Sequence, residues 1–253
     1  MGKTFEALER AEKEYGDKTL ELSIGSARRR RERGHAAKNC YEVLKTNILA
    51  RHPGHLIKTI LFSGTTHGDG SSTTSINFAT TLACNCRLEV LLIEANMRTP
   101  SLHRAFNVET EHGLSDLLTN GNESALCIKK VDPGNLSVVT AGSRLTDPVT
   151  LFESKRFFDF LIAEREKYDY VILDGPSVPG SSDVRVICNK VDGVVLVLEA
   201  GKTRKQVAVR AKHELEEAGG KLLGVVLNKR KFYIPEWIYK RLYNRVFDES
   251  LFL

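Results

Sequence analysis

The fold of this chain is decided by residues 59–74, which read TILFSGTTHGDGSSTT. An apolar strand-like run is followed by a turn of small residues and then by a stretch that suits a helix. In such an arrangement the backbone N–H groups of the turn face a bound phosphate, and the positive end of the helix dipole adds to the attraction. Gly68 and Gly70 preserve this backbone cradle. The stretch therefore predicts a phosphate-binding loop, called here the phosphate loop (residues 64–72).

One position departs from the usual motif, in which a lysine and then a serine or threonine follow the last glycine. This chain has Ser71 in place of the lysine, whereas the hydroxyl that holds Mg²⁺ is retained at Ser72. Phosphoryl transfer depends on neutralising charge on the γ-phosphate oxygens, so losing this cation should impair transfer most. We expect weak or absent binding of ATP or ADP with Mg²⁺. The expected nucleotide contacts are Gly68, Asp69, Gly70, Ser71, Ser72 and Thr73.

Length and composition favour one α/β domain. The chain has 253 residues, enough for one large core. Its longest apolar stretches, such as 90–93 and 194–198, are far shorter than the roughly 20 residues needed to span a bilayer. The five cysteines show no paired spacing or zinc-ligand pattern, which fits a reducing compartment. We therefore expect a soluble, cytoplasmic protein without a cleavable signal.

The formal net charge of +5 is unevenly distributed. Arginines occupy positions 28–31 and 33, in a stretch whose composition is typical of a flexible tether. Such a run either is a solvated linker or contacts anionic lipid or nucleic acid. The sequence predicts three parts: an N-terminal helix with the basic tether (1–38), an α/β domain (39–230) and a tail (231–253).

Within the central part, strand and helix patterns alternate, and a separate helix over 41–49 leads into it. The strands read as continuous Val/Ile/Leu runs, typical of strands covered by helices on both faces. We therefore predict a doubly wound, mostly parallel sheet flanked by helices, with its ligand site beyond the carboxyl ends of the strands. The expected strands are 58–63, 90–94, 137–140, 170–174, 193–198 and 222–227, and the expected helices are 72–83, 157–165 and 207–218.

A second motif supports a nucleotide site. The run Tyr170-Val171-Ile172-Leu173 is a buried-type strand that ends in the carboxylate of Asp174. In the Walker B arrangement such a carboxylate lies beside the Mg²⁺ that the phosphate-loop hydroxyl holds, here Ser72. Together with the glycine turn upstream, this strand predicts the P-loop NTPase fold, with Ser72 and Asp174 as metal ligands.

The strand that ends at Glu94 continues as Ala95-Asn96-Met97-Arg98 and is followed by Pro100. With the motifs above, the chain resembles the bacterial tyrosine kinases of capsule and exopolysaccharide biosynthesis, a branch of the deviant Walker P-loop ATPases that also include MinD and ParA. In that family two aspartates and a basic residue precede the proline. The similarity covers nearly the whole chain, and it is carried by 5–9, 173–177, 182–183, 192–197, 201–203 and 223–228.

The resemblance assigns catalytic positions to Glu94, Asn96 and Asp174, but the first two depart from the family. Glu94 is one methylene longer than aspartate; it could touch a metal through water but would misplace a general base by about an ångström. Asn96 cannot carry charge or accept a proton. By resemblance, Arg98 is the best remaining cation near the phosphates and Asn228 contacts the adenine edge; each is alternatively a structural hydrogen-bonding residue. The family's loop has proline where this chain has His67, which we interpret as an exposed loop residue.

Two further family features are altered. The family's oligomerisation helix carries glutamate, arginine and arginine at three-residue intervals before Thr-Asn, where this chain has Asn39, Glu42 and Lys45. The family phosphorylates a tyrosine-rich tail. The tyrosines of this tail are dispersed among apolar residues at helical spacing, so a docking or membrane-surface helix is the favoured interpretation. The candidate phosphoacceptors are Tyr233, Tyr239 and Tyr243.

Three functional hypotheses follow. The first is a cytoplasmic, pseudokinase-like regulator of exopolysaccharide or capsule export at the inner face of the membrane, with a membrane-embedded polysaccharide copolymerase as partner. The second is an active autokinase in which Arg98, Lys45 or a cation from another chain replaces the lysine. The third is a ParA- or MinD-like positioning ATPase that uses the arginine run or the tail. Self-assembly is compatible with each, and a nucleic-acid partner is not expected under the first two.

Overall fold

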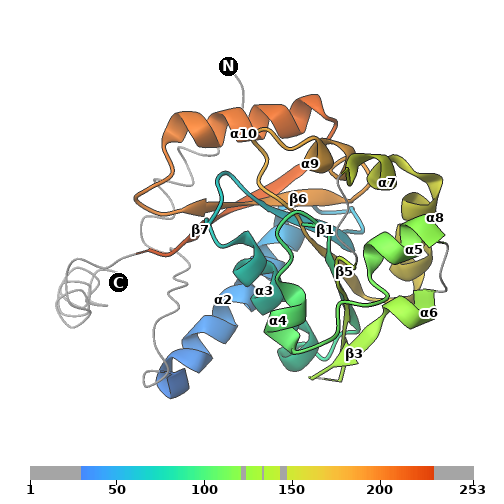
Figure 1. The fold of residues 1–253 in the computed structure, drawn as a ribbon. Coiled ribbons are helices and arrows are strands. Elements are labelled where there is room, and N and C mark those ends of the chain that lie inside the picture. The colour runs from blue at the N-terminus through green and yellow to red at the C-terminus, as the bar shows by residue number, and fades with distance from the viewer. Residues whose placement is uncertain (1–29, 121–123, 133, 143–146, 231–253) are drawn as a thin grey trace, which may run out of the picture.

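The computed structural model describes residues 30–120, 124–132, 134–142 and 147–230. These residues form a seven-stranded sheet in the order β3-β4-β2-β5-β1-β6-β7 (Figure 1). Neighbouring strands are parallel except β3 and β4, which pair antiparallel. The strands are β1 (Thr59–Gly64), β2 (Val90–Glu94), β3 (Lys129–Val131), β4 (Leu136–Val139), β5 (Tyr170–Asp174), β6 (Gly193–Glu199) and β7 (Leu222–Asn228).

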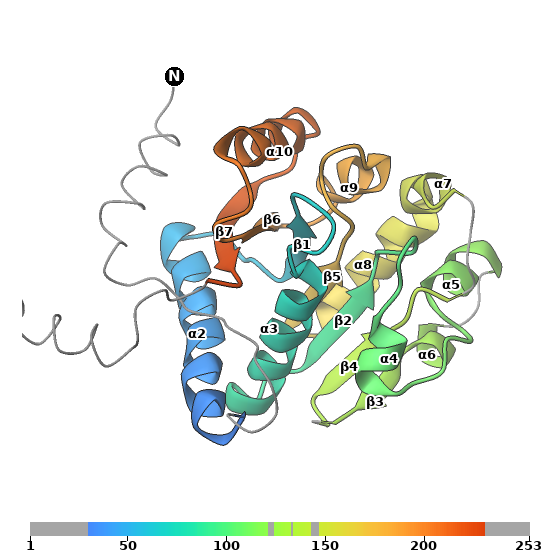
Figure 2. The same ribbon diagram turned by 60° about the vertical axis from the view of Figure 1, so that its left-hand side comes forward.

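Helices cover both faces of this sheet. Figure 2 shows α2 and α3 side by side over one face and α8, α9 and α10 over the other. The helices are α2 (Arg30–Arg51), α3 (Ser71–Asn85), α4 (Leu102–Phe106), α5 (Leu114–Asn120), α6 (Ser124–Cys127), α7 (Val149–Glu153), α8 (Lys155–Lys167), α9 (Ser182–Ile187) and α10 (Lys205–Glu217). None of the described helices combines the length and apolar character that a bilayer crossing requires.

The core lies in two layers because successive strand side chains point to opposite faces. In β1, Leu61 belongs to the layer under α5 and α7–α10, whereas Ile60 and Phe62 belong to the layer under α2 and α3. Every residue of β1, β2 and β5 is buried. This is the burial that the continuous apolar runs predicted, and the doubly wound, mostly parallel sheet is confirmed.

Some elements differ from the prediction. The short strand β3 was missed because its sequence, Lys129-Lys130-Val131, has no apolar run and lies at the edge of the sheet. The helices of four to seven residues were missed because they are shorter than two helical turns and show no period. Helix α2 begins at Arg30, inside the segment predicted to be a flexible tether. The N-terminal helix predicted before the basic tether and the tail 231–253 lie outside the described residues, and the three-part division stays a prediction.

Candidate functional site

The candidate site lies beyond the carboxyl ends of three adjacent strands, β2, β5 and β1. Phe62 of β1 pairs in register with Asp174 of β5, and Asp174 in turn pairs with Glu94 of β2. The phosphate loop begins at Gly64, the last residue of β1, and ends at Ser72, the second residue of α3. Tertiary structure thus brings together the loop and the two acids that the sequence placed on separate strands.

The two loop glycines are required by the backbone conformation. Gly68 has φ of +91° and Gly70 has φ of +90°, values that side-chain-bearing residues rarely adopt. A Cβ atom on Gly70 would lie 2.1 Å from Nδ2 of Asn228. Gly70 therefore allows the end of β7 to approach the phosphate loop closely.

Asp69 binds the loop itself. Its carboxylate is almost fully buried and accepts four hydrogen bonds: from the backbone N–H groups of Thr65 and Thr66, each at 2.8 Å, and from their hydroxyls at 2.6 and 2.7 Å. The side chain of Asp69 thus fixes the conformation of the phosphate loop. The nucleotide contact expected of Asp69 stays a prediction.

Asp174 is the strongest candidate for a metal ligand. Its side chain is fully buried, and neither carboxylate oxygen makes a hydrogen bond of good geometry. Its pKa is raised from 3.8 to about 7, chiefly by burial and to a lesser extent by the nearby Glu94 carboxylate, against the opposing effect of the Ser72 and Ser75 hydroxyls. A buried carboxylate without a partner, next to the Ser72 hydroxyl, offers the hard oxygen donors that Mg²⁺ prefers. The residues present therefore fit a magnesium ion shared with phosphate oxygens.

The Glu94 carboxylate accepts hydrogen bonds from three backbone N–H groups. It is fully buried, and its Oε1 accepts hydrogen bonds from the backbone N–H groups of Ser101 and Leu102, the latter at 2.7 Å. Its Oε2 accepts from the N–H group of Ala141 at 3.0 Å. The predicted water-mediated metal contact has no support in this arrangement, because the extra methylene carries the carboxylate to the start of α4. Asn96 likewise accepts from the N–H group and the hydroxyl of Thr99, at 3.3 and 3.2 Å.

The two cations of this chain that were proposed to replace the loop lysine, Arg98 and Lys45, have other partners. Arg98 makes a two-pronged contact with the buried Asp183, with Nε–Oδ2 of 2.9 Å and Nη2–Oδ1 of 3.0 Å. Lys45 lies with Nζ 6.0 Å from the ring centroid of Tyr170, the first residue of β5 and thus at the opposite edge of the sheet. Within one chain Lys45 therefore cannot replace the loop lysine. His67 is exposed, as predicted.

Asn228 makes hydrogen bonds that support the loop, and the adenine contact expected of it stays a prediction. Its Nδ2 donates to the carbonyl oxygen of Asp69 at 2.9 Å, and its Oδ1 accepts from the N–H group of Lys229 at 2.8 Å. The side chain is only 5% exposed. The amide thus ties the end of β7 to the phosphate loop.

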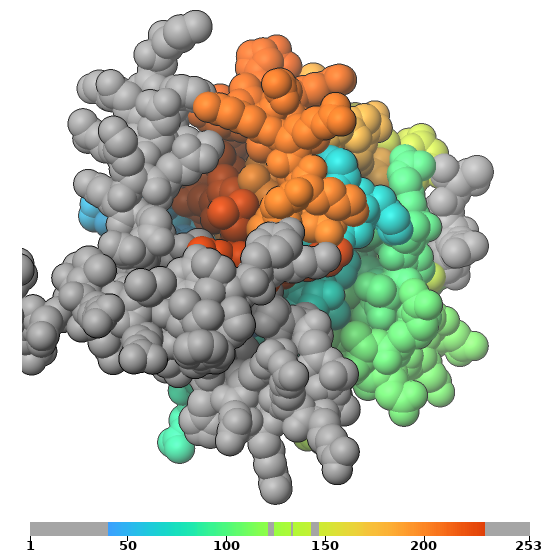
Figure 3. All heavy atoms as spheres, turned by 90° about the vertical axis from the view of Figure 1, so that its left-hand side faces the viewer, coloured from blue at the N-terminus to red at the C-terminus, as the bar shows by residue number. Residues whose placement is uncertain are grey.

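Lys229 reaches the loop and was not singled out from the sequence. Its Nζ donates to the carbonyl oxygen of Gly68 and lies 3.3 Å from Oε2 of Glu199, which also pairs with Lys202 at 3.0 Å. Figure 3 shows the phosphate loop (cyan) beside the orange and red segments that lead out of β6 and β7. A lysine directly after a strand carries no distinguishing motif, so only the fold reveals this contact.

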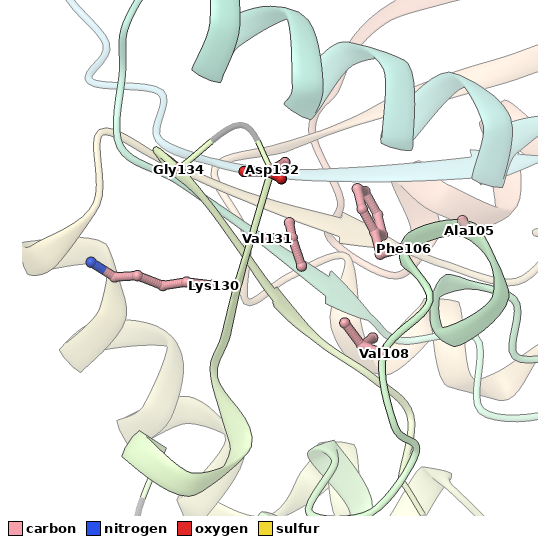
Figure 4. Close-up of a pocket in the computed structure, with 7 residues that line it drawn as sticks. All are labelled: Ala105, Phe106, Val108, Lys130, Val131, Asp132 and Gly134. Atoms are coloured by element: carbon pink, nitrogen blue, oxygen red, sulfur yellow. The ribbon is translucent and has the colours of Figure 1, made fainter.

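A hollow of about 520 Å³ lies away from this site, between α4 and the β3–β4 turn. Figure 4 shows Phe106, Val108 and Val131 lining it, with the Lys130 side chain directed away. None of the residues that line the hollow belongs to the phosphate loop or is one of the two acids, and we assign it no part in the site.

Comparison with known proteins gives a consistent result. No family model matches the chain. The tyrosine-protein kinase YwqD of Bacillus subtilis is 32% identical over 191 residues, covering 76% of this chain and 80% of YwqD. The tyrosine-protein kinase CpsD of Streptococcus pneumoniae is 34% identical over 196 residues, covering 76% of this chain and 84% of CpsD.

Solved structures agree. The chimerical protein CapA2B2 has a TM-score of 0.78 at 27% identity, covering 88% of this chain and 99% of its own. The kinase domain of the Escherichia coli tyrosine kinase ETK has a TM-score of 0.74 at 25% identity, and the match covers 88% of this chain and 90% of the ETK domain. The cell division ATPase MinD of Pyrococcus furiosus shares the fold. It is 18% identical with a TM-score of 0.60, and the match covers 73% of this chain and 78% of MinD.

Proposed function

Because the chain belongs to the family of bacterial tyrosine-protein kinases, we propose that it is a kinase-like regulator of exopolysaccharide or capsule biosynthesis with impaired phosphoryl transfer. One observation carries the proposal: the site keeps its loop, Ser72 and Asp174, but has Ser71 in place of the lysine. Such a site retains the groups that hold a nucleotide and a metal ion and lacks the charge that stabilises transfer.

The retained residues suit binding. When bound, a nucleotide with Mg²⁺ would supply the phosphoryl group and the divalent charge that polarises it. The backbone of the phosphate loop would face the phosphates, and Ser72 with Asp174 would hold the ion. Asp174 would then be ionised, because a nearby cation lowers the raised pKa of its carboxyl.

The altered residues do not suit catalysis. A tyrosine hydroxyl must lose its proton as it attacks, which requires an acceptor within hydrogen-bond reach. Glu94 already accepts three backbone hydrogen bonds, and Asn96 has no basic group. Arg98 is held by Asp183, so its fork is not directed at the loop. These features support binding without efficient turnover.

The proposed partner is a membrane-embedded polysaccharide copolymerase, at the inner face of the cell membrane. This part of the proposal is supported by the family resemblance and by the likeness to the CapA2B2 chimera. Self-assembly through α2 is less favoured, since Glu42 accepts a hydrogen bond from Asn85 at 2.7 Å and Lys45 lies over Tyr170 in the same chain.

The test measures phosphotyrosine formation by the full chain with ATP and Mg²⁺. The chain is assayed alone and after co-expression with a two-helix membrane protein encoded by a neighbouring reading frame. We expect no more phosphotyrosine than in the Asp174→Ala variant, and a gain on Ser71→Lys only if the remaining site supports chemistry. Phosphate on Tyr233, Tyr239 or Tyr243 of the native chain that depends on Asp174 would overturn the impaired activity and favour an active autokinase. The ParA- and MinD-like hypothesis rests on the shared fold alone.

A further inference from the structure

A lysine from another segment lies beside the phosphate loop, whose own sequence motif has no lysine. The Lys229 ammonium donates to the Gly68 carbonyl oxygen, at the outer turn of the loop. A Cβ atom built on Gly70 would lie 3.9 Å from Cε of Lys229, so the stem of this side chain passes directly over the loop. The positive charge of Lys229 therefore lies against the phosphate loop.

We infer that Lys229 takes the place of the missing loop lysine as the cation for bound phosphate, reaching the loop from the end of β7 instead of from α3. The inference rests on the proposed nucleotide binding and names the residue by which this same site holds phosphate. Ser71 can offer only a hydroxyl at the usual position.

The backbone around Lys229 is built to hold it there. Lys229 has φ of +57°, a left-handed conformation that is uncommon for a residue with a side chain. Its N–H group donates to Oδ1 of Asn228, whose Nδ2 donates to the carbonyl of Asp69 in the loop. The backbone of Lys229 is thus fastened to the phosphate loop by a single amide, and the strained turn directs the side chain back over it.

The ammonium can exchange its present partners for phosphate. The Lys229 side chain is 46% exposed, so its terminal atoms can turn without disturbing the core. A phosphate oxygen is a stronger partner for an ammonium than a neutral carbonyl oxygen, because the hydrogen bond is then charged on both sides. Exchanging the Gly68 carbonyl for a phosphate oxygen therefore strengthens this hydrogen bond of the ammonium.

Glu199 competes for the same ammonium. Its Oε2 lies 3.3 Å from Nζ of Lys229 and 3.0 Å from Nζ of Lys202. Hydrogen bonding to Lys202, and then to Lys229, lowers the pKa of the Glu199 carboxyl, so it is ionised at neutral pH. An incoming phosphate must displace this carboxylate from Lys229, so Glu199→Gln should tighten nucleotide binding.

Titration calorimetry of ADP with Mg²⁺ on the full chain tests the inference. We expect Lys229→Met to weaken binding by about 10-fold to 100-fold, the loss typical of one charge-assisted hydrogen bond. Lys229→Arg should retain most of the affinity. Lys202→Met is the matched control, because the Lys202 ammonium pairs with Glu199 whereas the Gly68 carbonyl is bound by Lys229. The loss of affinity in Lys202→Met should be much smaller. Unchanged thermal unfolding would show that each variant is folded.

A double-mutant cycle makes the test specific. If both lysines serve the same phosphates, Ser71→Lys should raise affinity more in the Lys229→Met background than in the native chain. Equal effects in both backgrounds, unchanged binding by Lys229→Met, or tighter binding by it would overturn the inference while nucleotide binding stands. No binding by the native chain, with binding by Ser71→Lys, would reject both the inference and the proposed nucleotide binding. The phosphotyrosine assay tests impaired transfer separately.

Discussion

The surroundings of Asp174 disfavour the ionised form of its carboxyl group. Both oxygens are buried without a hydrogen bond, and the pKa rises from 3.8 to about 7. Because the folded-state pKa lies above the unfolded one, the folded protein binds the proton more tightly. The contribution of this group to stability is thus largest below about pH 4 and is lost progressively between pH 4 and pH 7.

We therefore expect Asp174→Asn to stabilise the ligand-free protein at pH 8 by about 1 to 4 kcal/mol, and much less at pH 5. Urea unfolding at both pH values measures this difference. Asp183→Asn is the control, since Asp183 is equally buried but paired with Arg98, and its loss should destabilise the protein. Equal effects of Asp174→Asn at both pH values would contradict the raised pKa.

Substitutions at Gly68 and Gly70 distinguish the cost of backbone strain from the cost of a steric clash. Both have positive φ, but a Cβ on Gly68 would meet nothing within 4 Å, whereas one on Gly70 would meet Asn228 at 2.1 Å. We expect Gly68→Ala to cost about 1 to 2 kcal/mol from strain alone. Gly70→Ala should cost more and should also reduce ADP binding, because Asn228 must move. Chemical unfolding and calorimetry of the two variants provide the comparison, and equal costs would contradict the close approach of β7.

At the scale of elements, one carboxylate joins three segments. Glu94 at the end of β2 binds the N–H groups at the start of α4 and the N–H group of Ala141 after β4. A carboxylate at a helix N-terminus also interacts favourably with the helix dipole. The acid that the family resemblance assigned to catalysis thus fastens β2, α4 and the loop after β4 in this chain.

Glu94→Asp should therefore destabilise the protein without creating a kinase. The shorter side chain cannot reach all three N–H groups, and buried donors left unpaired cost about 1 to 3 kcal/mol each. Guanidinium unfolding measures the loss, with the exposed Glu111→Asp as control. A gain of phosphotyrosine formation in Glu94→Asp would show that the carboxylate is the limiting catalytic group and would contradict this interpretation.

At the scale of the whole molecule, the site depends on both core layers. The sheet sets β1 between β5 and β6, with β7 beside β6, so the loop lies between the acids on one side and Lys229 on the other. The two layers hold this order, because each strand contributes side chains to both. A ligand that binds across the strand ends should thus stabilise the entire fold.

We expect Mg²⁺ with ADP to raise the thermal unfolding midpoint by about 3 to 6 °C at about ten times the dissociation constant. ADP without Mg²⁺ should raise it less, since Asp174 then stays without its cation. Ser72→Ala should remove the Mg²⁺-dependent part of the shift, whereas Ser124→Ala, on the distant α6, should retain it. An identical shift with and without Mg²⁺ would contradict a metal site at Ser72 and Asp174.

The sequence by itself determined the sheet, the phosphate loop and the two acid positions. Long apolar runs such as 90–94 and 170–174 can be buried only as central strands, and β2 and β5 have the predicted bounds. A glycine-rich turn between a strand and a helix can adopt few conformations other than a phosphate loop. Short, partly polar elements such as β3 remained out of reach, because their formation depends on a neighbouring strand and not on their own pattern.

Only the tertiary structure decided what the polar side chains at the site do. Glu94 was expected at a catalytic position, and Asn228 and Asp69 at a nucleotide. In the structure the side chain of each makes hydrogen bonds to backbone groups of the chain. Lys229 has no motif, yet its ammonium lies on the phosphate loop. The physical reason is that hydrophobic patterning is local and can be read along the chain, whereas the hydrogen-bond partners at this site come from segments up to 161 positions apart and meet only once the chain has folded.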